Sequence, residues 1–417
     1  MNTKIINTHP QLVPMPTNIW DRVNLMRRHS ILHGEAVRER LMLKALESVP
    51  AAERLAKLHT FFRPKYDLKE CDFERDMAWF RQALPIAHAA HQHLLKDFVP
   101  LLDRKNLEMI SDVGTECDPL ELILYTARAT QAASEHPDDV VTCRAADEGH
   151  RQLRLTQLEF EAMLYGLSKA DLSIAMSRFV SALEGGGFFA EGRSERLFFE
   201  ADHDPANKHR VKGQPTIRHN GNPRRSIPEG LVRNEQPLDV RFIKTPRGNV
   251  RVFFDPRIKE YLSLKLIRDC EVDPRALHDL LGAKFVFFST ADLRAGVRAL
   301  RETLVRIPGM VFGQASNLQR AGVANAENGS SANEYRVLKF NVHLFGQYFE
   351  LQFMLIEDWL NEWASYGEEN HEFYKIRAYR TELFPFIWPR VRYRIDWNDK
   401  DLVQRMLRMV HSRIGWI

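Results

Sequence analysis

Apolar and polar residues alternate most strictly between residues 334 and 355. This period of two predicts a pair of strands, and Gly346-Gln347 between them fits a two-residue type II′ turn. The predicted register places Val342 opposite Leu351 and Phe340 opposite Phe353, so one face of the hairpin is apolar. The opposite face collects polar and ionisable residues: Tyr335, Lys339, Asn341, His343, Glu350 and Gln352.

Two further strands and a helix are predicted before this hairpin. Residues 249–254 and 283–288 are short apolar runs typical of strands. After the second strand, apolar residues recur at helical spacing on one face, at Leu293, Val297, Leu300 and Leu304. Strands that alternate with a helix favour mixed α/β or α+β packing in this part of the chain.

Residues 1–150 have helical periodicity, mainly over 18–62 and 74–110. Pro85 and Pro100 are expected to break the second stretch into shorter helices. Its histidines at 88, 91 and 93 do not share one helical face, which favours surface histidines over a metal site. These residues therefore predict an α-helical region without an assigned role.

Residues 151–202 have a different pattern of elements. A capping box at Thr156–Glu159 marks the start of one short helix, and Gly166 marks its end. A longer apolar helix follows and ends at Gly185–Gly187. Two short apolar pieces then flank a polar turn at 192–195. Helix, turn, helix and β-ribbon in this order resemble a winged-helix module. Such modules bind DNA or serve as protein contacts, and the second helix offers Lys169 and Arg178 near its exposed face.

Residues 203–248 read as a basic linker. The surrounding stretch 201–250 holds ten Lys and Arg residues against five acids, with many Pro, Gly and Asn. A solvated connection is the simpler interpretation. The alternative is an electrostatic guide for nucleic acid or nucleotide phosphates.

Candidate chemistry begins at Arg257. Lys259 and Ser263 are one helical turn apart and Lys265 follows closely, so these donors can converge on one anion. Later, His371, Tyr374 and Lys375 share a helical face and can point together at a phosphate.

Asp279 and Glu350 are the candidate metal-binding pair. Asp279 precedes a buried strand and is followed by Gly282, an arrangement that can present a carboxylate where the backbone approaches a ligand. Glu350 lies on the polar face of the predicted hairpin. A merely solvated sheet face would have the same pattern, so a structural role for both carboxylates stays open.

Taken in order, these pieces resemble the synthetase domain of RelA/SpoT-like alarmone synthetases. The matching motifs are Arg257-x-Lys259-x-x-x-Ser263-x-Lys265, Asp279-x-x-Gly282, Tyr335 before a strand, Glu350-x-Gln352 and His371-x-x-Tyr374-Lys375. The resemblance covers about residues 250–380. It implies a nucleotidyltransferase-like domain over 249–417, with a mixed sheet flanked by helices. It also implies transfer of pyrophosphate from ATP to the 3′-hydroxyl of GDP or GTP, the reaction of a GTP/GDP diphosphokinase.

The resemblance further implies a role for each matching residue. Asp279 and Glu350 would hold Mg²⁺, and Glu350 would also assist deprotonation of the attacking hydroxyl. The ATP-binding residues would be Arg257, Lys259, Ser263, Lys265 and Lys284. The acceptor or its phosphates would contact Tyr335, Lys339, Gln352, His371 and Lys375. Positioning, cationic clamps and a metal are what phosphoryl-type transfer needs.

Four positions depart from the family pattern. Lys284 stands where the family has Arg, and Glu334, Val337 and Lys339 stand where the acceptor loop has Gly, Ser and His. Glu334 would repel an acceptor phosphate, so another nucleotide or the 3′ end of tRNA becomes an alternative acceptor. A further alternative is a winged-helix regulator whose nucleotidyltransferase-like domain senses nucleotide without catalysis. Residues 1–200 hold no His-Asp hydrolase motif, which predicts synthesis without hydrolysis.

Composition is compatible with this organisation. The 417 residues are 44% hydrophobic and 27% charged, with 59 Lys and Arg against 55 Asp and Glu, a mild positive excess. Four widely spaced cysteines predict reduced thiols, and the chain shows neither a secretory signal nor an apolar run of membrane-spanning length. We therefore expect a cytoplasmic α+β protein that binds a nucleotide and no membrane. The pattern specifies neither the acceptor nor the oligomeric state.

Overall fold

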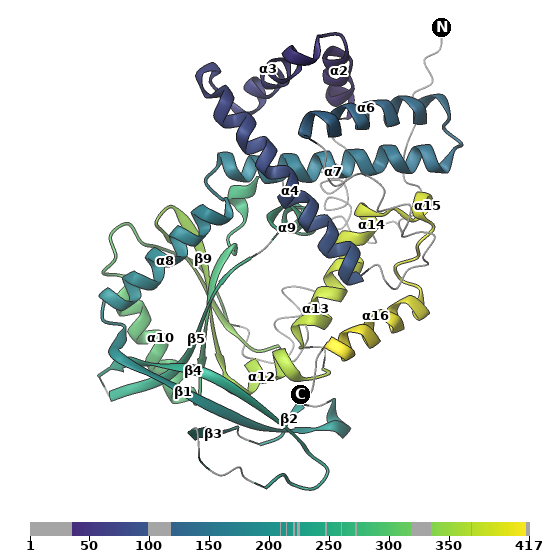
Figure 1. Ribbon diagram of the computed structural model, residues 1–417. Coiled ribbons are helices and arrows are strands. Elements are labelled where there is room, and N and C mark those ends of the chain that lie inside the picture. The colour runs from purple at the N-terminus through teal and green to yellow at the C-terminus, as the bar shows by residue number, and fades with distance from the viewer. Residues whose placement is uncertain are drawn as a thin grey trace. The chain divides into compact units, whose positions relative to one another are not determined.

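The computed structural model describes residues 36–98, 118–317 and 335–413, apart from positions 209, 214, 220–221, 223–225, 247, 260, 272 and 368. These residues form an α+β fold with a mixed, open sheet, as predicted at that level. The chain divides into two compact units (Figure 1). The helical unit comprises Met1–Ser168, Tyr261–Ala276 and Ala378–Met406; the sheet unit comprises Lys169–Glu260, Leu277–Arg377 and Leu407–Ile417.

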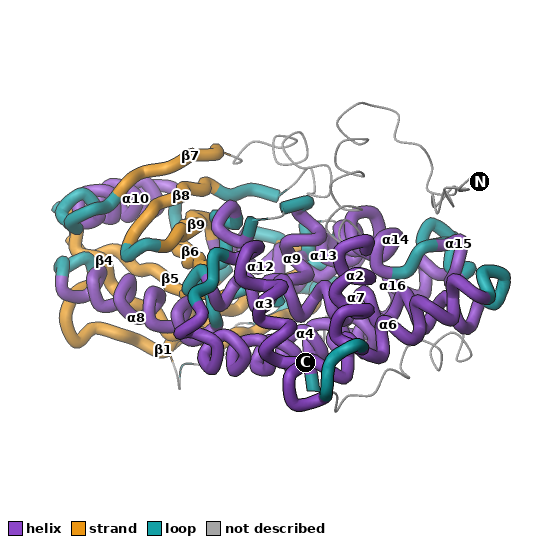
Figure 2. The backbone as a smooth tube through the Cα atoms, turned by 90° about the horizontal axis from the view of Figure 1, so that it is seen from above, coloured by secondary structure: helices purple, strands orange, loops and turns teal. Residues whose placement is uncertain are grey.

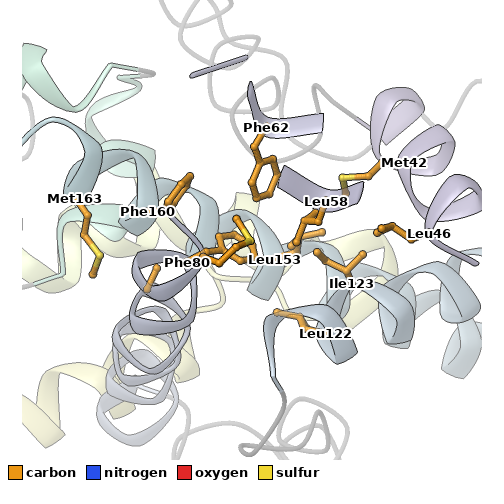
Figure 3. Close-up of a cluster of buried hydrophobic side chains, with 12 residues drawn as sticks. Met42, Leu46, Leu58, Phe62, Phe80, Leu122, Ile123, Leu153, Phe160 and Met163 are labelled. Carbon is orange, nitrogen blue, oxygen red and sulfur yellow. The ribbon is translucent and has the colours of Figure 1, made fainter. Parts of the chain in front are cut away.

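Long helices build the helical unit. In chain order they are α2 (Ala36–Glu47), α3 (Arg54–Tyr66), α4 (Phe73–Phe98), α6 (Pro119–Glu135), α7 (Val140–Leu164) and α9 (Leu262–Asp269), followed by the short α14 (Phe384–Ile387) and α15 (Arg390–Tyr393). An apolar cluster joins α2, α3, α4, α6 and α7 (Figure 3). In it, the rings of Phe80 and Phe160 meet edge to face, with centroids 5.5 Å apart. The last helix, α16 (Lys400–Arg413), has its residues up to Met406 assigned to the helical unit and the rest to the sheet unit.

Three expectations for the helical unit were wrong. His91 is not a surface histidine, because it is only 1% exposed. Pro85 does not break α4, because buried Phe80, Ala83 and Ala87 hold the helix on both sides of the proline. Thr156 caps no helix. It lies inside α7, and its hydroxyl donates to the carbonyl of Gln152 at 2.8 Å. The N-cap of α7 is Asp139, which accepts the Val141 N–H at 3.0 Å. The predicted helical residues 18–35, and Pro100, lie outside the described residues.

One sheet contains every described strand of the sheet unit. The strands are β1 (Phe189–Asp204), β2 (Arg210–Val211), β3 (Thr216–His219), β4 (Val232–Thr245), β5 (Gly248–Ile258), β6 (Leu281–Phe287), β7 (Val311–Asn317), β8 (Leu338–Leu344) and β9 (Gln347–Leu355). Their order is β2-β1-β4-β5-β6-β9-β8-β7, and β3 also pairs with β1. The β6–β9 pair is parallel and the others are antiparallel.

Helices cover both faces of this sheet. On one face, Phe179 of α8 (Lys169–Gly185) packs against Phe349. Gly296 of α10 (Thr290–Leu304) faces the Phe287 ring on the same side, so closely that a Cβ there would lie 2.3 Å from it. On the other face, Trp359 of α12 (Ile356–Ala364) packs against Phe253. Figure 2 shows the strands gathered in one region with α8 and α10 beside them.

The predicted ribbon and linker were wrong. Residues 192–195 form no turn, because the chain passes through them as an irregularity inside the long strand β1. The expected two-stranded wing is therefore a single strand paired with β2, β3 and β4. Residues 203–248 are not a linker, since they contain β2, β3 and the central strand β4. Their charged composition obscured the alternation of buried Leu238 and Val240.

The strands of the predicted hairpin are confirmed, but the turn and the register were wrong. Phe345 and Gly346 both have positive φ, at 52° and 79°, which is the backbone of a type I′ turn. Gln347 therefore belongs to β9, and the observed pairs are Phe340 with Leu351 and Val342 with Phe349. Because this slip is two residues, each side chain stays on its predicted face.

Candidate functional site

Four strands carry polar residues across one face of the sheet, on the side of α12. The first row is Asp255, Lys284, Gln352 and Lys339, which are direct neighbours on β5, β6, β9 and β8. The second row, two residues along each strand, is Arg257, Gly282, Glu350 and Asn341. We call these two rows the polar face. It brings together five of the residues predicted from sequence, on strands separated by up to 100 positions.

Gly282 is the one position in these two rows that has no side chain. A Cβ at this position would lie 2.9 Å from the Glu350 carbonyl oxygen, so a side chain could be added only by moving the backbone. The consequence is a strip without a side chain between Arg257 and Glu350.

Two lysine–carboxylate pairs lie at partly exposed positions of the sheet unit, and we call them the rim pairs. Lys259 directly follows β5 and pairs with Asp279, which precedes β6. Lys339 on β8 pairs with Glu350 on β9 at 3.4 Å, and Gln352 donates a further hydrogen bond to Glu350. The side chains of Lys259 and Asp279 are 42% and 24% exposed to solvent. Those of Lys339 and Glu350 are 28% and 17% exposed. Both predicted metal ligands therefore have a lysine as neighbour.

A third pair, Lys284 with Glu362 of α12, is buried. Both residues are 5% exposed, and the ammonium donates to the two carboxylate oxygens at 2.5 and 2.6 Å. Burial lowers the pKa of Lys284, although Glu362 opposes the shift. Burial acts to raise the pKa of Glu362, but the charge of Lys284 and its hydrogen bonds outweigh this effect and leave the pKa lowered. Lys284 thus serves Glu362 and is not presented to a phosphate.

Helix α13 (His371–Ala378) contributes the last predicted motif. His371 Nδ1 is 3.9 Å from Glu362, and its ring stacks with Tyr374 at 6.1 Å. Its pKa is lowered to about 4, first by removal from bulk water and then by Lys375 and Lys284, so the ring is neutral at pH 7. Lys375 pairs with Glu372 at 2.8 Å.

Tyr335 lies beside this group. The Lys339 ammonium is 5.9 Å from the centroid of its ring. Burial, followed by the charges of Glu362 and Glu350, raises the pKa of the phenol well above its usual value. Tyr335 is therefore a neutral aromatic group. Glu334, its neighbour in sequence, lies outside the described residues.

Ser263 and Lys265 belong to the helical unit, whereas Arg257 and Lys259 belong to the sheet unit. Ser263 is fully buried on α9, and its N–H donates to Glu159 of α7 at 2.9 Å. Lys265 is 7% exposed and pairs with Asp269 at 2.5 Å. The four donors expected around ATP phosphates are therefore not grouped within one unit.

The basic residues of 203–248 that the structure describes are largely paired. Arg210 binds Glu369 at 2.8 Å, and Arg233 binds Asp202 at 2.7 Å. Arg218 bridges Glu200 and Glu235. These contacts reduce the net positive charge that a nucleic acid would meet. Arg224, Arg225 and Arg247 lie outside the described residues.

The chemistry of Asp279 and Glu350 fits Mg²⁺. This ion is usually held by one or two carboxylates together with water and substrate phosphates. Asn341, directly opposite Glu350, adds an amide of the kind that accompanies such carboxylates. Within the described ranges there is no cluster of three or more His, Cys, Asp or Glu side chains around one point, which such a two-carboxylate site does not require.

Sequence reasoning missed Glu362. The sequence pattern that could have revealed it is a carboxylate three residues after Trp359, on the buried side of an amphipathic helix. A buried acid needs a cation, and Lys284 was the lysine that already departed from the family pattern. Together the two positions could have predicted the pair.

Comparison of the chain with known protein families, with curated proteins and with solved structures finds no match. The residues of the polar face are therefore the basis on which a function can be proposed. Among the described helices, none has the length and apolar character needed to span a membrane.

Proposed function

We propose that the protein is an ATP- and Mg²⁺-dependent pyrophosphotransferase of the alarmone-synthetase type, with its catalytic residues on the polar face and beside it, in a nucleotidyltransferase-like sheet unit. The observation that carries the proposal is the pair of rows on four neighbouring strands, with Gly282 between Arg257 and Glu350. Motifs separated in sequence by dozens of residues lie on one face at adjacent positions. A sheet face exposed only to water does not require this grouping.

In the proposed reaction, a nucleotide 3′-hydroxyl attacks the β-phosphorus of ATP. The bond from this phosphorus to the bridging α–β oxygen breaks, and AMP leaves with that oxygen. Glu350 takes the hydroxyl proton, while Arg257 and Lys259 bind the phosphates. Tyr335 offers its neutral ring for stacking on the acceptor base. Asp279 and Glu350 would hold Mg²⁺, which when bound neutralises phosphate charge.

The roles assigned to three residues change. Lys284 is proposed to anchor α12 through Glu362 instead of binding ATP, because its ammonium is buried and doubly bonded. Ser263 and Lys265 are left without a role at the polar face. The acceptor remains GDP, GTP, another nucleotide or the 3′ end of tRNA, and the paired arginines of 203–248 do not favour RNA over a mononucleotide.

The test is a transfer assay with γ-labelled ATP and Mg²⁺, using GDP, GTP or deacylated tRNA as acceptor. We expect labelled acceptor with the wild-type protein and a loss of about 100-fold or more in Glu350→Gln, as for removal of a general base. The matched control is Glu302→Gln, an exposed carboxylate on α10, which covers the opposite face. Equal rates in wild type, Glu350→Gln and Asp279→Asn would reject the enzyme. Nucleotide binding without transfer would then favour the nucleotide-sensing regulator.

A further inference from the structure

The two predicted metal ligands each have a lysine as partner. The proposed reaction assigns phosphates to Lys259, and the family resemblance assigns the acceptor or its phosphates to Lys339. We propose that Lys259 and Lys339 are exchangeable counter-ions. In the metal-free protein they neutralise Asp279 and Glu350, and when a divalent cation takes the carboxylates, the released ammonium groups bind the polyphosphate. This proposal rests on the proposed function and adds a coupling between metal and phosphate binding.

The backbone holds each rim pair together. The Lys259 N–H donates to the Leu280 carbonyl at 2.8 Å, which fixes the end of β5 beside the residue that follows Asp279. On the other strands, Lys339 is opposite Gln352 and Asn341 is opposite Glu350, so Lys339 reaches Glu350 diagonally. In both pairs the backbone is fixed and only a flexible lysine chain has to move. Exchange therefore needs no change in the fold.

Burial separates the pairs that can exchange from the one that cannot. The rim pairs are partly exposed, and ion pairs in contact with water are weak because solvent screens them. Lys284 and Glu362 are both buried, so separating them would leave an uncompensated charge in the protein interior. A cation arriving from solvent will displace the rim lysines and leave Lys284 in place.

The balance of charges explains why binding of the metal and binding of the phosphate should be coupled. The polar face and its surroundings contain five pairs: Arg257 with Asp255, Lys259 with Asp279, Lys284 with Glu362, Lys339 with Glu350, and Lys375 with Glu372. A bare polyphosphate therefore meets as many carboxylates as cations in these pairs. A divalent cation on Asp279 and Glu350 removes this repulsion and frees two ammonium groups. By linkage, each ligand must strengthen the binding of the other.

The test measures binding and no transfer. Mn²⁺, which prefers the same oxygen ligands as Mg²⁺, is titrated into the full chain, and free ion is followed by its electron paramagnetic resonance signal. We expect Lys259→Met and Lys339→Met to tighten Mn²⁺ binding about two- to fivefold, the range set by an exposed ion pair, because each removes a competitor for a carboxylate. Lys375→Met is the matched control, since its partner Glu372 is not a proposed ligand, and its Mn²⁺ affinity should equal that of wild type.

The second half of the test uses inorganic tripolyphosphate, titrated calorimetrically with and without saturating Mg²⁺. Mg²⁺ should strengthen binding about tenfold in wild type, and this gain should shrink in both rim variants. Unchanged or weaker Mn²⁺ binding in both variants, or no Mn²⁺ binding by any protein, overturns the proposal. If exchange is observed but the transfer assay is negative, the exchange stands and the enzyme proposal fails. Circular dichroism confirms that each variant is folded.

Discussion

The two units use ionisable residues in different ways. In the helical unit, Arg151 and Glu148 are buried inside the helix bundle. Arg151 donates to Glu148, to the Ile387 carbonyl at 2.9 Å and to the Tyr393 hydroxyl at 2.8 Å. In the sheet unit, most of the ion pairs on the polar face and around it keep contact with water. The same residue types therefore serve as structural links in one unit and as an accessible surface in the other, and burial decides which.

Lys284 and Glu362 are the exception within the sheet unit. They resemble the buried contacts of the helical unit, yet they lie between the accessible residues of the polar face. We therefore expect substitutions to separate three groups of residues by their effect on stability: the helical-unit network, the buried pair and the rim pairs.

The largest effect is expected for Arg151→Met. This variant leaves Glu148 as a buried charge without its guanidinium and removes hydrogen bonds to Ile387 and Tyr393, so the helical unit should lose about 3–5 kcal/mol or more. Urea unfolding measures the loss. Arg128→Met, at an exposed position of α6, should change stability by less than about 0.5 kcal/mol. A similar small change for Arg151→Met would contradict the structural role of this network.

Glu362→Gln should come next, with a loss of about 3 kcal/mol from the sheet unit, because Lys284 then keeps a buried charge without a counter-ion. The double variant Lys284→Met/Glu362→Leu replaces both charges by apolar groups and should recover most of the loss. Thermal unfolding of the two variants checks this order. If the double variant is as unstable as Glu362→Gln, the buried charge is not the cause.

Asp358 on α12 is expected to make the stability of the sheet unit depend on pH. Burial raises its pKa to about 6, with Glu357 and Glu369 adding to the shift and Arg336 opposing it. A carboxyl whose pKa is raised on folding binds more protons in the folded state, so its contribution to stability falls as pH rises from about 4 to 6. Asp358→Asn should therefore raise stability at pH 7, by about 1–3 kcal/mol, and leave it nearly unchanged at pH 4. Urea titrations at both pH values test this, with Glu302→Gln, an exposed carboxylate on α10, as control. An equal change at pH 4 and 7 would contradict it.

The smallest effect is expected for Lys339→Met. Its pair with Glu350 is partly exposed, so the change in stability should stay within about 1 kcal/mol. The same variant is expected to alter metal and tripolyphosphate binding. A large loss of stability would place Lys339 with the buried pair and would argue against its release by a metal.

Part of the fold was predictable because its signal is local. The alternation at 334–355 located two strands, and the spacing of Leu293, Leu300 and Leu304 located the buried face of α10. Pro85 misled because packing on both sides of a proline can hold a helix that local preference would break. The turn at Phe345 was missed because a non-glycine residue rarely adopts positive φ, and only the β8–β9 pairing required it here.

The candidate site divides in the same way. Residue type and spacing alone determined which side chains could bind a phosphate or a metal, because those capacities belong to the side chain. Only the tertiary structure decided that Arg257, Gly282 and Glu350 are neighbours, that Lys284 is buried against Glu362, and that Ser263 lies in the helical unit. The reason is physical: strand neighbours and burial depend on contacts between segments far apart in the chain, and these contacts decide whether a charge is a structural link or a group available to a ligand.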